Sequence, residues 1–264
     1  MTAPSLIEYR VDAGIAIVTL NRPEKRNALS DAMRAELVAA LECAASDTSV
    51  RALVVTGNGR SFCAGGDIQG MQQRLQSPPG EIAFNGWNRQ KRTHHAVSLL
   101  HGIPKPTIAA VNGSSAGLGT DLALCCDFIV ASDDASFAWS YIHRGLIPDG
   151  GGLYFLPRRV GLARAKELIF TGRIVEAPEA LALGVADRIS PASSLLADAT
   201  RWAAELGKGS ATALALGKGI LDQSFEMDAS TVFDLGSQAQ SICYTTAEHH
   251  RSVSDFLAKR KTQG

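Results

Sequence analysis

The sequence predicts a mixed α/β core followed by a helical C-terminal region. In the first half of the chain, short apolar and β-branched runs alternate with longer segments of helical periodicity. Two of these runs, 51–56 and 107–111, open directly into glycine-rich loops, and from residue 162 onward the chain reads as helices alone. This order is typical of an α/β fold with a helical extension. We place the boundary between a core at 1–195 and a helical region at 196–264.

The first half begins with a predicted hairpin, in which Asp12, Ala13 and Gly14 separate two strands. Ser30 is a suitable N-cap for the next helix, because its hydroxyl oxygen can accept a hydrogen bond from the first turn. The third strand ends in the first glycine-rich loop, 57–67. The predicted elements here are strands at 7–10, 15–20 and 51–56 and helices at 30–46 and 82–101.

The second half opens on a buried strand, a glycine-rich turn and a helix that continues through 122–126. Short strands follow, and helical periodicity then takes over to the end of the chain. The predicted strands are 107–111, 128–131 and 135–139, and the predicted helical segments are 162–171, 178–183, 193–206, 211–225 and 229–262.

Length and composition indicate a globular protein without a general electrostatic partner. The 264 residues are 45% hydrophobic, enough for a sizeable core. The 26 basic and 26 acidic residues cancel, so we expect neither nucleic acid nor an anionic membrane as a partner. The chain has no apolar run of roughly 20 residues, and its first ten residues lack the features of a signal peptide. A cytoplasmic location is the expectation.

Five cysteines do not form a recognisable metal or disulfide pattern. They lie at Cys43, Cys63, Cys125, Cys126 and Cys243, without C-x-x-C spacing or suitably spaced histidines. We therefore predict no metal site and reduced cysteines in the core. Cys63 lies in a glycine-rich loop and is considered as a catalytic thiol, although no histidine is close to it in sequence.

The stretch 106–121, PTIAAVNGSSAGLGTD, carries the strongest functional signal in the chain. Glycine at 113, 117 and 119 allows main-chain conformations closed to other residues and a close approach of a ligand. The first N–H groups of the following helix then point into that space, with the positive end of the helix dipole behind them. The stretch therefore predicts a site for an anion or a developing oxyanion.

Other chemistries with a similar outline fit less well. The patterns of a phosphate-binding loop and of a dinucleotide-binding fold are both absent. Residues 113–117 do match the G-x-S-x-G motif of serine hydrolases, with Ser115 as nucleophile and His249 or His250 as the base. Those histidines fall in a predicted helix rather than a loop after a strand, which argues against that interpretation.

Several short motifs in a fixed order make the chain resemble the crotonase family, the enoyl-CoA hydratase/isomerase superfamily. The resemblance covers nearly the whole length. The motifs are Asn21-Arg22-Pro23, Asn27-Ala28-Leu29, Phe62-Cys63-Ala64-Gly65-Gly66-Asp67, Ala110-Val111-Asn112-Gly113, Gly117-x-Gly119, Cys126-Asp127, Gly145-Leu146-Ile147-Pro148, Leu156-Pro157-Arg158, Thr171-Gly172 and Gly184-Val185-Ala186.

The resemblance implies a fold and a shared chemistry. The fold would be a spiral of β-β-α turns with a helical region that mediates assembly into a homotrimer or a hexamer. The chemistry would be stabilisation of a thioester enolate by two backbone N–H groups, which by position are those of Gly66 and Leu118. Each such donor is worth about 10²–10³ in rate. Leu118 stands where glycine is commoner, and its side chain need not affect the donor.

The resemblance also implies where the substrate binds. Coenzyme A would be part of an acyl-CoA substrate, and no separate cofactor is expected. The positions carried over for CoA are Lys25, Arg26, Ala28, Ala64, Asp67 and Ile68. Lys259 in the last helix is a candidate for a phosphate, across subunits or within one. Without the resemblance, lysine and arginine at these places would be taken as solvated charges.

The acid and base positions depart from the hydratase pattern. Hydratases of this family use two glutamates, and this chain has Asp121 and Tyr141 at those places. Tyrosine is a poor general base at neutral pH because its ordinary pKa is about 10. Asp121 is either the second carboxylate of the site or a residue that caps the helix.

Asp149 is the preferred acid/base residue. It lies in the Pro-Asp-Gly loop, where dienoyl-CoA isomerases, ring-epoxyphenylacetyl-CoA isomerases and chlorobenzoyl-CoA dehalogenases of the family place a working aspartate. Taken alone, such a sequence is an ordinary turn. Trp139 and Tyr141 would line the acyl pocket or pack in the core, and surface roles are expected for His94 and His95.

The expected function is therefore double-bond migration in an enoyl-CoA, as in fatty acid metabolism, with Asp149 as the acid/base. One alternative is hydration with Asp121 and Asp149, which would make the enzyme a lyase. An alternative of another class is a protein that binds CoA thioesters without turnover.

Overall fold

Residues 5–261 of the chain are described by a computed structural model, except for the side chains of residues 73, 74, 260 and 261. The first four residues of the N-terminal stretch, and residue 262 of the last predicted helical segment, lie outside the described residues. The strands are β1 (Ile7–Asp12), β2 (Ile15–Leu20), β3 (Ala52–Gly57), β4 (Ser61–Cys63), β5 (Thr107–Val111), β6 (Ser114–Ala116), β7 (Phe128–Ser132), β8 (Ser136–Ala138), β9 (Ile174–Glu176) and β10 (Arg188–Ser190).

Helices occupy most of the remaining chain. The α-helices are α1 (Asp31–Ser46), α2 (Ile68–Arg74), α3 (Pro79–His101), α4 (Leu118–Leu124), α5 (Gly152–Val160), α6 (Leu162–Thr171), α7 (Ala177–Leu183), α8 (Leu195–Leu206), α9 (Ala211–Leu221), α10 (Ala229–Tyr244) and α11 (Ala247–Lys261). Two 3₁₀ turns, η1 (Pro23–Lys25) and η2 (Ser140–Arg144), follow strands.

Consecutive strands divide between two sheets. The larger sheet has the order β1-β2-β3-β5-β7-β10, and the smaller has the order β4-β6-β8-β9. The pairs β3/β4, β5/β6 and β7/β8 each place one strand in either sheet. Helices follow the first two pairs directly, so the chain advances by repeated β-β-α turns. The predicted α/β spiral is confirmed.

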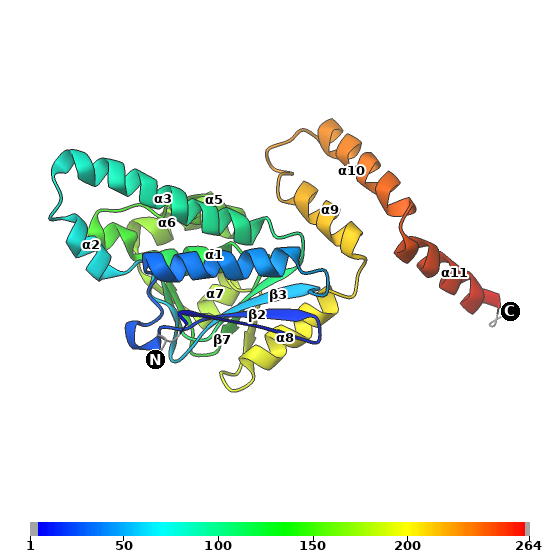
Figure 1. The fold of residues 1–264 in the computed structure, drawn as a ribbon, viewed down its shortest axis with the longest axis horizontal. Helices are drawn as coiled ribbons and strands as arrows, with labels where there is room; N and C mark the ends of the chain where they lie inside the picture. Colours follow the sequence, from blue (N-terminus) through cyan, green and yellow to red (C-terminus); the bar gives the residue numbers. More distant parts are fainter. Residues whose placement is uncertain (1–4, 262–264) are drawn as a thin grey trace.

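The apolar core lies on both faces of the larger sheet. Side chains of β2, β3 and β5 alternate between a cluster that includes α1, α3 and α4 and a second cluster against α8. Figure 1 shows α1 and α3 on one side of the sheet and α8 on the other. Since Leu195, Ala199 and Ala203 of α8 are buried on the sheet, this helix is part of the core packing.

The C-terminal helices α9, α10 and α11 extend away from the core, as Figure 1 shows. The predicted segment at 229–262 is two helices, because α10 ends at Tyr244 and α11 begins at Ala247. Lys218 fastens α9 to the core through a 2.9 Å ion pair with Asp127. The division between domains at residue 195 remains a prediction.

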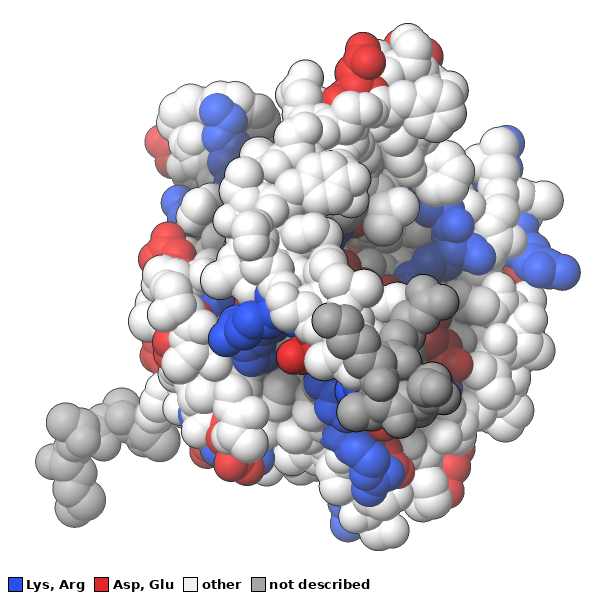
Figure 2. Space-filling view, turned by 90° about the vertical axis from the view of Figure 1, so that its right-hand side faces the viewer, with Lys and Arg blue, Asp and Glu red and all other residues white. Residues whose placement is uncertain are grey.

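The surface near these helices carries charges of both signs. Figure 2 shows Lys and Arg interspersed with Asp and Glu among uncharged residues on this face, which agrees with the balanced composition. Within the described residues, no helix has the length and apolar character needed to cross a membrane.

Candidate active site

Three neighbouring parallel strands of the smaller sheet end at the candidate site. β4 pairs with β6, and β6 pairs with β8, all in parallel. Because the carboxyl ends of parallel strands meet at one edge, the segments that follow them converge. These segments contain Gly66 after β4, Leu118 after β6 and Tyr141 after β8.

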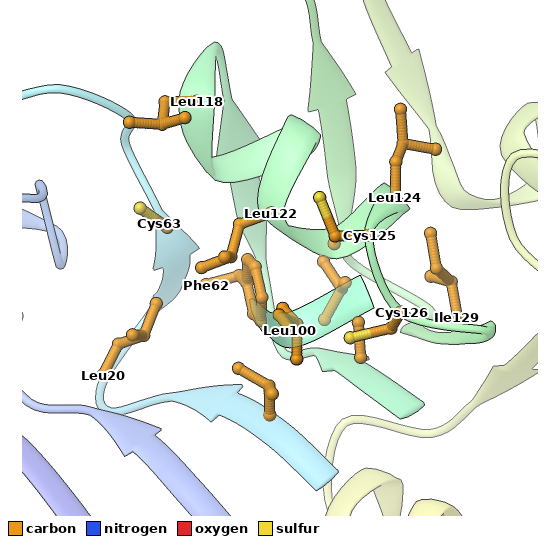
Figure 3. Close-up of a cluster of buried hydrophobic side chains, with 14 of the residues drawn as sticks. Leu20, Phe62, Cys63, Leu100, Leu118, Leu122, Leu124, Cys125, Cys126 and Ile129 are labelled. Atoms are coloured by element: carbon orange, nitrogen blue, oxygen red, sulfur yellow. The ribbon is translucent and has the colours of Figure 1, made fainter. Parts of the chain in front are cut away.

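The two predicted oxyanion donors lie on loops in close contact. A Cβ atom built on Gly65 would lie 2.7 Å from the Ala116 oxygen and 3.3 Å from the Leu118 nitrogen. A Cβ atom on Gly119 would lie 2.2 Å from the Cys63 oxygen. Only glycine therefore lets these loops pack together. Figure 3 shows Cys63, at the end of β4, and Leu118, at the start of α4, in the same cluster of buried side chains.

The N–H groups of Gly66 and Leu118 both lie where regular secondary structure supplies no backbone acceptor. Leu118 is the first residue of α4, and the first N–H groups of a helix have no partner within it. In the bridge between Leu29 and Gly66, the Leu29 N–H donates to the Gly65 oxygen at 2.7 Å and the Asp67 N–H donates to the Leu29 oxygen at 3.2 Å. The Gly66 N–H therefore takes no part in that pairing. That these two amides donate to one oxygen atom stays a prediction from the family resemblance.

A buried asparagine holds the loop 21–28 against the glycine-rich loop 57–67. Asn27 is fully buried, and its Nδ2 donates to the backbone oxygens of Asn58, Ser61 and Phe62 at 2.8–3.1 Å. The Ala64 N–H also donates to the Arg26 oxygen at 2.9 Å. The loop 21–28 is therefore a fixed wall of the site.

A cleft of about 790 Å³ lies above these loops. It brings together nine of the predicted residues: Lys25, Arg26, Ala28, Ala64, Gly66, Asp67, Ile68, Leu118 and Tyr141. The carboxylate of Asp67 accepts a 2.6 Å hydrogen bond from Arg22, which holds the pKa of that carboxyl below its usual range. Arg144 of η2 also lines the cleft and adds a third positive charge to those of Lys25 and Arg26. This arrangement can bind a phosphate-bearing ligand.

Asp121 is fully buried and forms a pair with Tyr141. The Tyr141 hydroxyl donates a 2.7 Å hydrogen bond to Oδ2 of Asp121. Burial raises the pKa of Asp121 to about 7, although the hydrogen bond from Tyr141 opposes this rise. Burial, and then the charge of Asp121, raise the pKa of Tyr141. The two positions at which hydratases carry glutamates are thus joined to each other in this chain.

The glycines after Asp149 are packed against this pair. A Cβ atom on Gly152 would lie 2.4 Å from Oδ1 of Asp121, and one on Gly150 would lie 2.3 Å from Cδ1 of Leu118. Residues 150–152 therefore favour glycine, because a side chain at Gly152 would meet Asp121 and Gly151 has a φ of +117°. Their close approach fixes Asp149 beside the carboxyl group of Asp121, whose pKa it also raises.

Asp149 faces α3 and a second cavity of about 570 Å³. The ring of His94, on α3, lies with Nε2 3.0 Å from the backbone oxygen of Asp149. Partial burial raises the pKa of the Asp149 carboxyl, while the nearby His94 and Arg89 lower it. A half-buried carboxyl with a raised pKa is a candidate for taking up and returning a proton.

Four residues considered from the sequence lie elsewhere. Trp139 is fully buried in the core cluster, and Lys259 is on α11, which extends away from the cleft of its own chain (Figure 1). Ser115 is buried and accepts a 3.3 Å hydrogen bond from Thr120, whereas His249 is on the projecting α11. Among the described residues, these positions do not form a serine hydrolase site.

Cys63 is not placed as a nucleophile either. Its thiol is fully buried, donates to the Asn27 oxygen at 3.1 Å, and has a pKa raised by burial to about 12. The thiolate is the reactive form, so this environment makes the side chain inert.

Sequence reasoning missed the residues that α3 contributes. His94 was expected to have a surface role, and it is exposed, but its ring contacts the Asp149 loop. Arg89 and Arg144 were not considered. Arg144 follows the same strand as Tyr141, so its place near the site could have been predicted from the sequence. The face of α3 that meets the site depends on packing between distant segments and could not.

Comparison with known proteins agrees with the fold. A family model described as enoyl-CoA hydratase/isomerase matches residues 10–263. The chain belongs to the enoyl-CoA hydratase/isomerase family and is an enzyme of this acyl-CoA-processing class.

Relatives at similar identity carry names for different reactions. The chain is 35% identical to a 1,2-epoxyphenylacetyl-CoA isomerase of Escherichia coli K12 over 253 residues, which are 96% of this chain and 95% of that protein. It is also 35% identical to a 2,3-dehydroadipyl-CoA hydratase of the same strain, over 93% of both chains. A crystal structure of an enoyl-CoA hydratase/isomerase from Cupriavidus metallidurans CH34 matches with a TM-score of 0.90 and 33% identity, covering 98% of this chain and 96% of that one.

Proposed function

We propose that the enzyme moves a carbon–carbon double bond within the acyl group of an enoyl-CoA. The observation that carries this proposal is the hydrogen bond between Tyr141 and Asp121. Of the two positions at which hydratases carry glutamates, only Asp121 has a carboxyl group, and Tyr141 occupies one of its oxygens. No pair of carboxylates is therefore free at these positions to hold and activate a water molecule. Asp149 is then the candidate acid/base carboxyl group, and it lines the second cavity.

The proposed reaction is a proton transfer with no other co-reactant. The Asp149 carboxylate takes a proton from the carbon next to the thioester carbonyl, and the electron pair moves onto the thioester oxygen. The N–H groups of Gly66 and Leu118 stabilise the enolate oxygen. Asp149 then returns the proton to the γ-carbon, which places the double bond in conjugation and regenerates the carboxylate.

In this proposal CoA enters as part of the substrate. Its phosphates would lie near Lys25, Arg26 and Arg144, and its pantetheine chain would follow the loop at Ala64 and Asp67, which line the cleft. A further cofactor is not required by the proton transfer itself. The isomerase name of one relative also supports the choice.

Hydration is the second candidate, because another relative at the same identity is named as a hydratase. The pKa of Asp121 of about 7 would let its carboxyl group exchange a proton with water at neutral pH if Tyr141 moved aside. Asp121 and Asp149 would then be the two acid/base groups.

Products distinguish these candidates. The enzyme is incubated with 3-enoyl-CoA and 2-enoyl-CoA thioesters of several chain lengths, linear and aromatic, and the products are resolved by liquid chromatography and mass spectrometry. The proposal predicts interconversion of the two isomers without a change in mass. A water adduct as the main product would favour the hydratase. Binding without any product or proton exchange would indicate a CoA-thioester-binding protein.

We also propose that the enzyme assembles as a homotrimer, or as two trimers forming a hexamer, through its C-terminal helices. Large apolar side chains are exposed there, including Phe225, Phe233 and Phe256 at 79%, 71% and 61%. Such surfaces mark protein–protein contacts. Light scattering coupled to size-exclusion chromatography tests this, and a monomer would contradict it. In a trimer, Lys259 could reach the CoA phosphates of a neighbouring subunit.

A further inference from the structure

The second cavity, of about 570 Å³, contains none of the oxyanion or CoA positions. Residues of α3, α5 and the end of α9 form its walls, and Asp149 is one of its lining residues. Figure 1 shows α9 beyond the C-terminal end of α3, so the helical region contributes to this space. Its volume is in the range of pockets that hold small organic ligands.

The cleft and the second cavity approach each other at Asp121. Tyr141, which lines the cleft, donates to Oδ2 of Asp121 at 2.7 Å. A Cβ atom built on Gly150 would lie 3.0 Å from the same oxygen, and Gly150 stands between Asp149 and Gly151, which line the second cavity. The walls of the two spaces therefore meet at one carboxyl group. An acyl group with its thioester in the cleft and its reacting carbons at Asp149 would extend into the second cavity.

One face of α3 forms a wall of the second cavity. His94, Val97, Ser98 and His101 all line it, at the spacing of residues that share one side of a helix. Nε2 of His94 lies 3.0 Å from the backbone oxygen of Asp149. His101 is two helical turns further, or about 10 Å at the usual rise per residue. The cavity thus runs along α3 from the candidate acid/base residue to His101.

Apolar and aromatic groups form much of this wall. Val97 and Ile103 are buried lining residues. The ring of Phe155 packs edge-on against His101 at 4.8 Å and against Tyr154 at 5.0 Å. Aromatic groups prefer such edge-to-face surroundings. The cavity therefore favours an acyl group that carries a ring.

A polar pair stands at the end of the cavity away from His94. Nε2 of His101 lies 3.8 Å from Oδ2 of Asp222, which caps the C-terminal end of α9, and their side chains are 28% and 24% exposed. This distance is too long for a hydrogen bond. Within residues 5–261, neither side chain has a hydrogen bond to another residue. Since 3.8 Å is less than twice the usual length of about 2.8 Å, one oxygen atom can lie within hydrogen-bond distance of both.

A hydroxyl group matches this pair, because it donates one hydrogen bond and accepts others. It would donate to the Asp222 carboxylate and accept from the His101 ring when Nε2 carries the proton. A carboxylate in its place would be repelled by Asp222, and the nearby Lys218 is already paired with Asp127 at 2.9 Å.

We propose that the second cavity binds the far end of the acyl group, and that the substrates are medium-length acyl-CoA thioesters with an aromatic ring and a terminal hydroxyl held by His101 and Asp222. This inference rests on the proposed function for the position of the thioester, and it names the substrate class.

Binding of saturated ligands tests the cavity separately from the reaction. The thioesters 4-(4-hydroxyphenyl)butanoyl-CoA and 4-phenylbutanoyl-CoA have no acyl double bond to migrate and differ by one hydroxyl group. Their dissociation constants are measured by isothermal titration calorimetry for the wild type, His101→Phe and Asp222→Ala. His95→Phe is the matched control, because His95 is exposed on the same helix and does not line the cavity. Thermal unfolding shows whether each variant is folded.

We expect the wild type to bind the hydroxylated ligand about tenfold more tightly, as for a hydrogen bond to a charged group. His101→Phe and Asp222→Ala should lose most of this preference. Their affinity for the phenyl ligand should stay within about twofold of wild type, because that ligand makes no such hydrogen bond. His95→Phe should keep the wild-type preference.

Equal affinity of the wild type for the two ligands would overturn the proposed substrate class, as would a preference that persists in both His101→Phe and Asp222→Ala. If one of these variants does not fold, the other decides, and the wild-type comparison stands without either. The expected preference in an enzyme that does not isomerise 3-enoyl-CoA would support the cavity and overturn the isomerase. Isomerisation without the preference would overturn the cavity alone.

Discussion

The hydroxyl of Tyr141 donates a 2.7 Å hydrogen bond to Oδ2 of the fully buried Asp121. This contact joins the segment after β8 to the first turn of α4, and it changes what the buried carboxyl group can do. In the proposed function, a carboxyl group held in this way is a structural and electrostatic element of the site, and Asp149 is the group that would reach a substrate.

Replacing Tyr141 with Phe should destabilise the fold without removing activity. Asp121 would keep its burial but lose the hydroxyl donor, and loss of a partner by a buried polar group costs about 1–3 kcal/mol. The free energy of unfolding is measured with urea, and isomerisation is assayed in parallel. Loss of all activity in a stable Tyr141→Phe variant would show that the hydroxyl itself takes part in the chemistry.

The free energy of unfolding should depend on pH because the pKa of Asp121 is raised in the folded state. The folded pKa of about 7 lies above the ordinary value near 4, so between these values the folded state holds a proton that the unfolded state releases. The stabilisation is complete below about pH 4 and is lost as pH rises through about 7. It amounts to about 4 kcal/mol at most.

Asp121→Asn tests this pH dependence directly, because the amide does not titrate. Urea unfolding of wild type and variant at pH 5 and pH 8 gives the difference between them. The stability of wild type relative to Asp121→Asn should fall from pH 5 to pH 8. A difference that is constant with pH would contradict the raised pKa.

Gly152→Ala should displace the loop that carries Asp149. The new Cβ atom would lie 2.4 Å from Oδ1 of Asp121 and 2.9 Å from Cβ of Pro148, so the backbone has to move. A misplacement of about 1 Å can cost about 10²-fold in rate. Gly80→Ala is the control, because nothing lies within 4 Å of its Cβ position. Turnover of Gly152→Ala equal to that of the control would contradict the close packing of Gly152 against Asp121.

Thiol reagents should modify the enzyme without inactivating it. Cys43 is exposed, whereas Cys63 is buried and its pKa is about 12. Iodoacetamide followed by peptide mass spectrometry should find label at Cys43 and none at Cys63 in the folded enzyme, with activity retained. Inactivation that tracks labelling of Cys63 would restore the catalytic-thiol interpretation.

Local signals in the sequence were sufficient for much of the fold. Ser30 caps α1 as predicted, with its hydroxyl accepting the Met33 N–H at 3.2 Å, and the hairpin, the strand at 107–111 and the helix at 162–171 are confirmed. Three-residue strands such as β4 and β6 are too short for a period to appear. The single helical segment expected at 229–262 was wrong in one respect, because the break at Thr245 and Thr246 lies in an otherwise helical pattern.

Some residues of the candidate site could be predicted from local sequence signals, and others could not. Motifs were sufficient to group Gly66, Leu118 and the CoA positions, because each lies just after a strand end and neighbouring strands bring such ends together. The alternation of side chains along a strand could not tell which of Trp139 and Tyr141 faces the core. The reason is that β8 ends at Ala138 and Tyr141 lies in a 3₁₀ turn. The contact of Arg89 with Gly66 depends on how α3 packs across the site, which no local pattern encodes.

Asp149→Asn tests the central proposal most directly, because the amide preserves the shape of the side chain and cannot accept the proton. Isomerisation of a 3-enoyl-CoA is measured for wild type and variant at saturating substrate, with CoA affinity as the check on an intact cleft. We expect a loss of about 10²–10⁴-fold in kcat with unchanged CoA affinity. An Asp149→Asn enzyme that isomerises at the wild-type rate would contradict it.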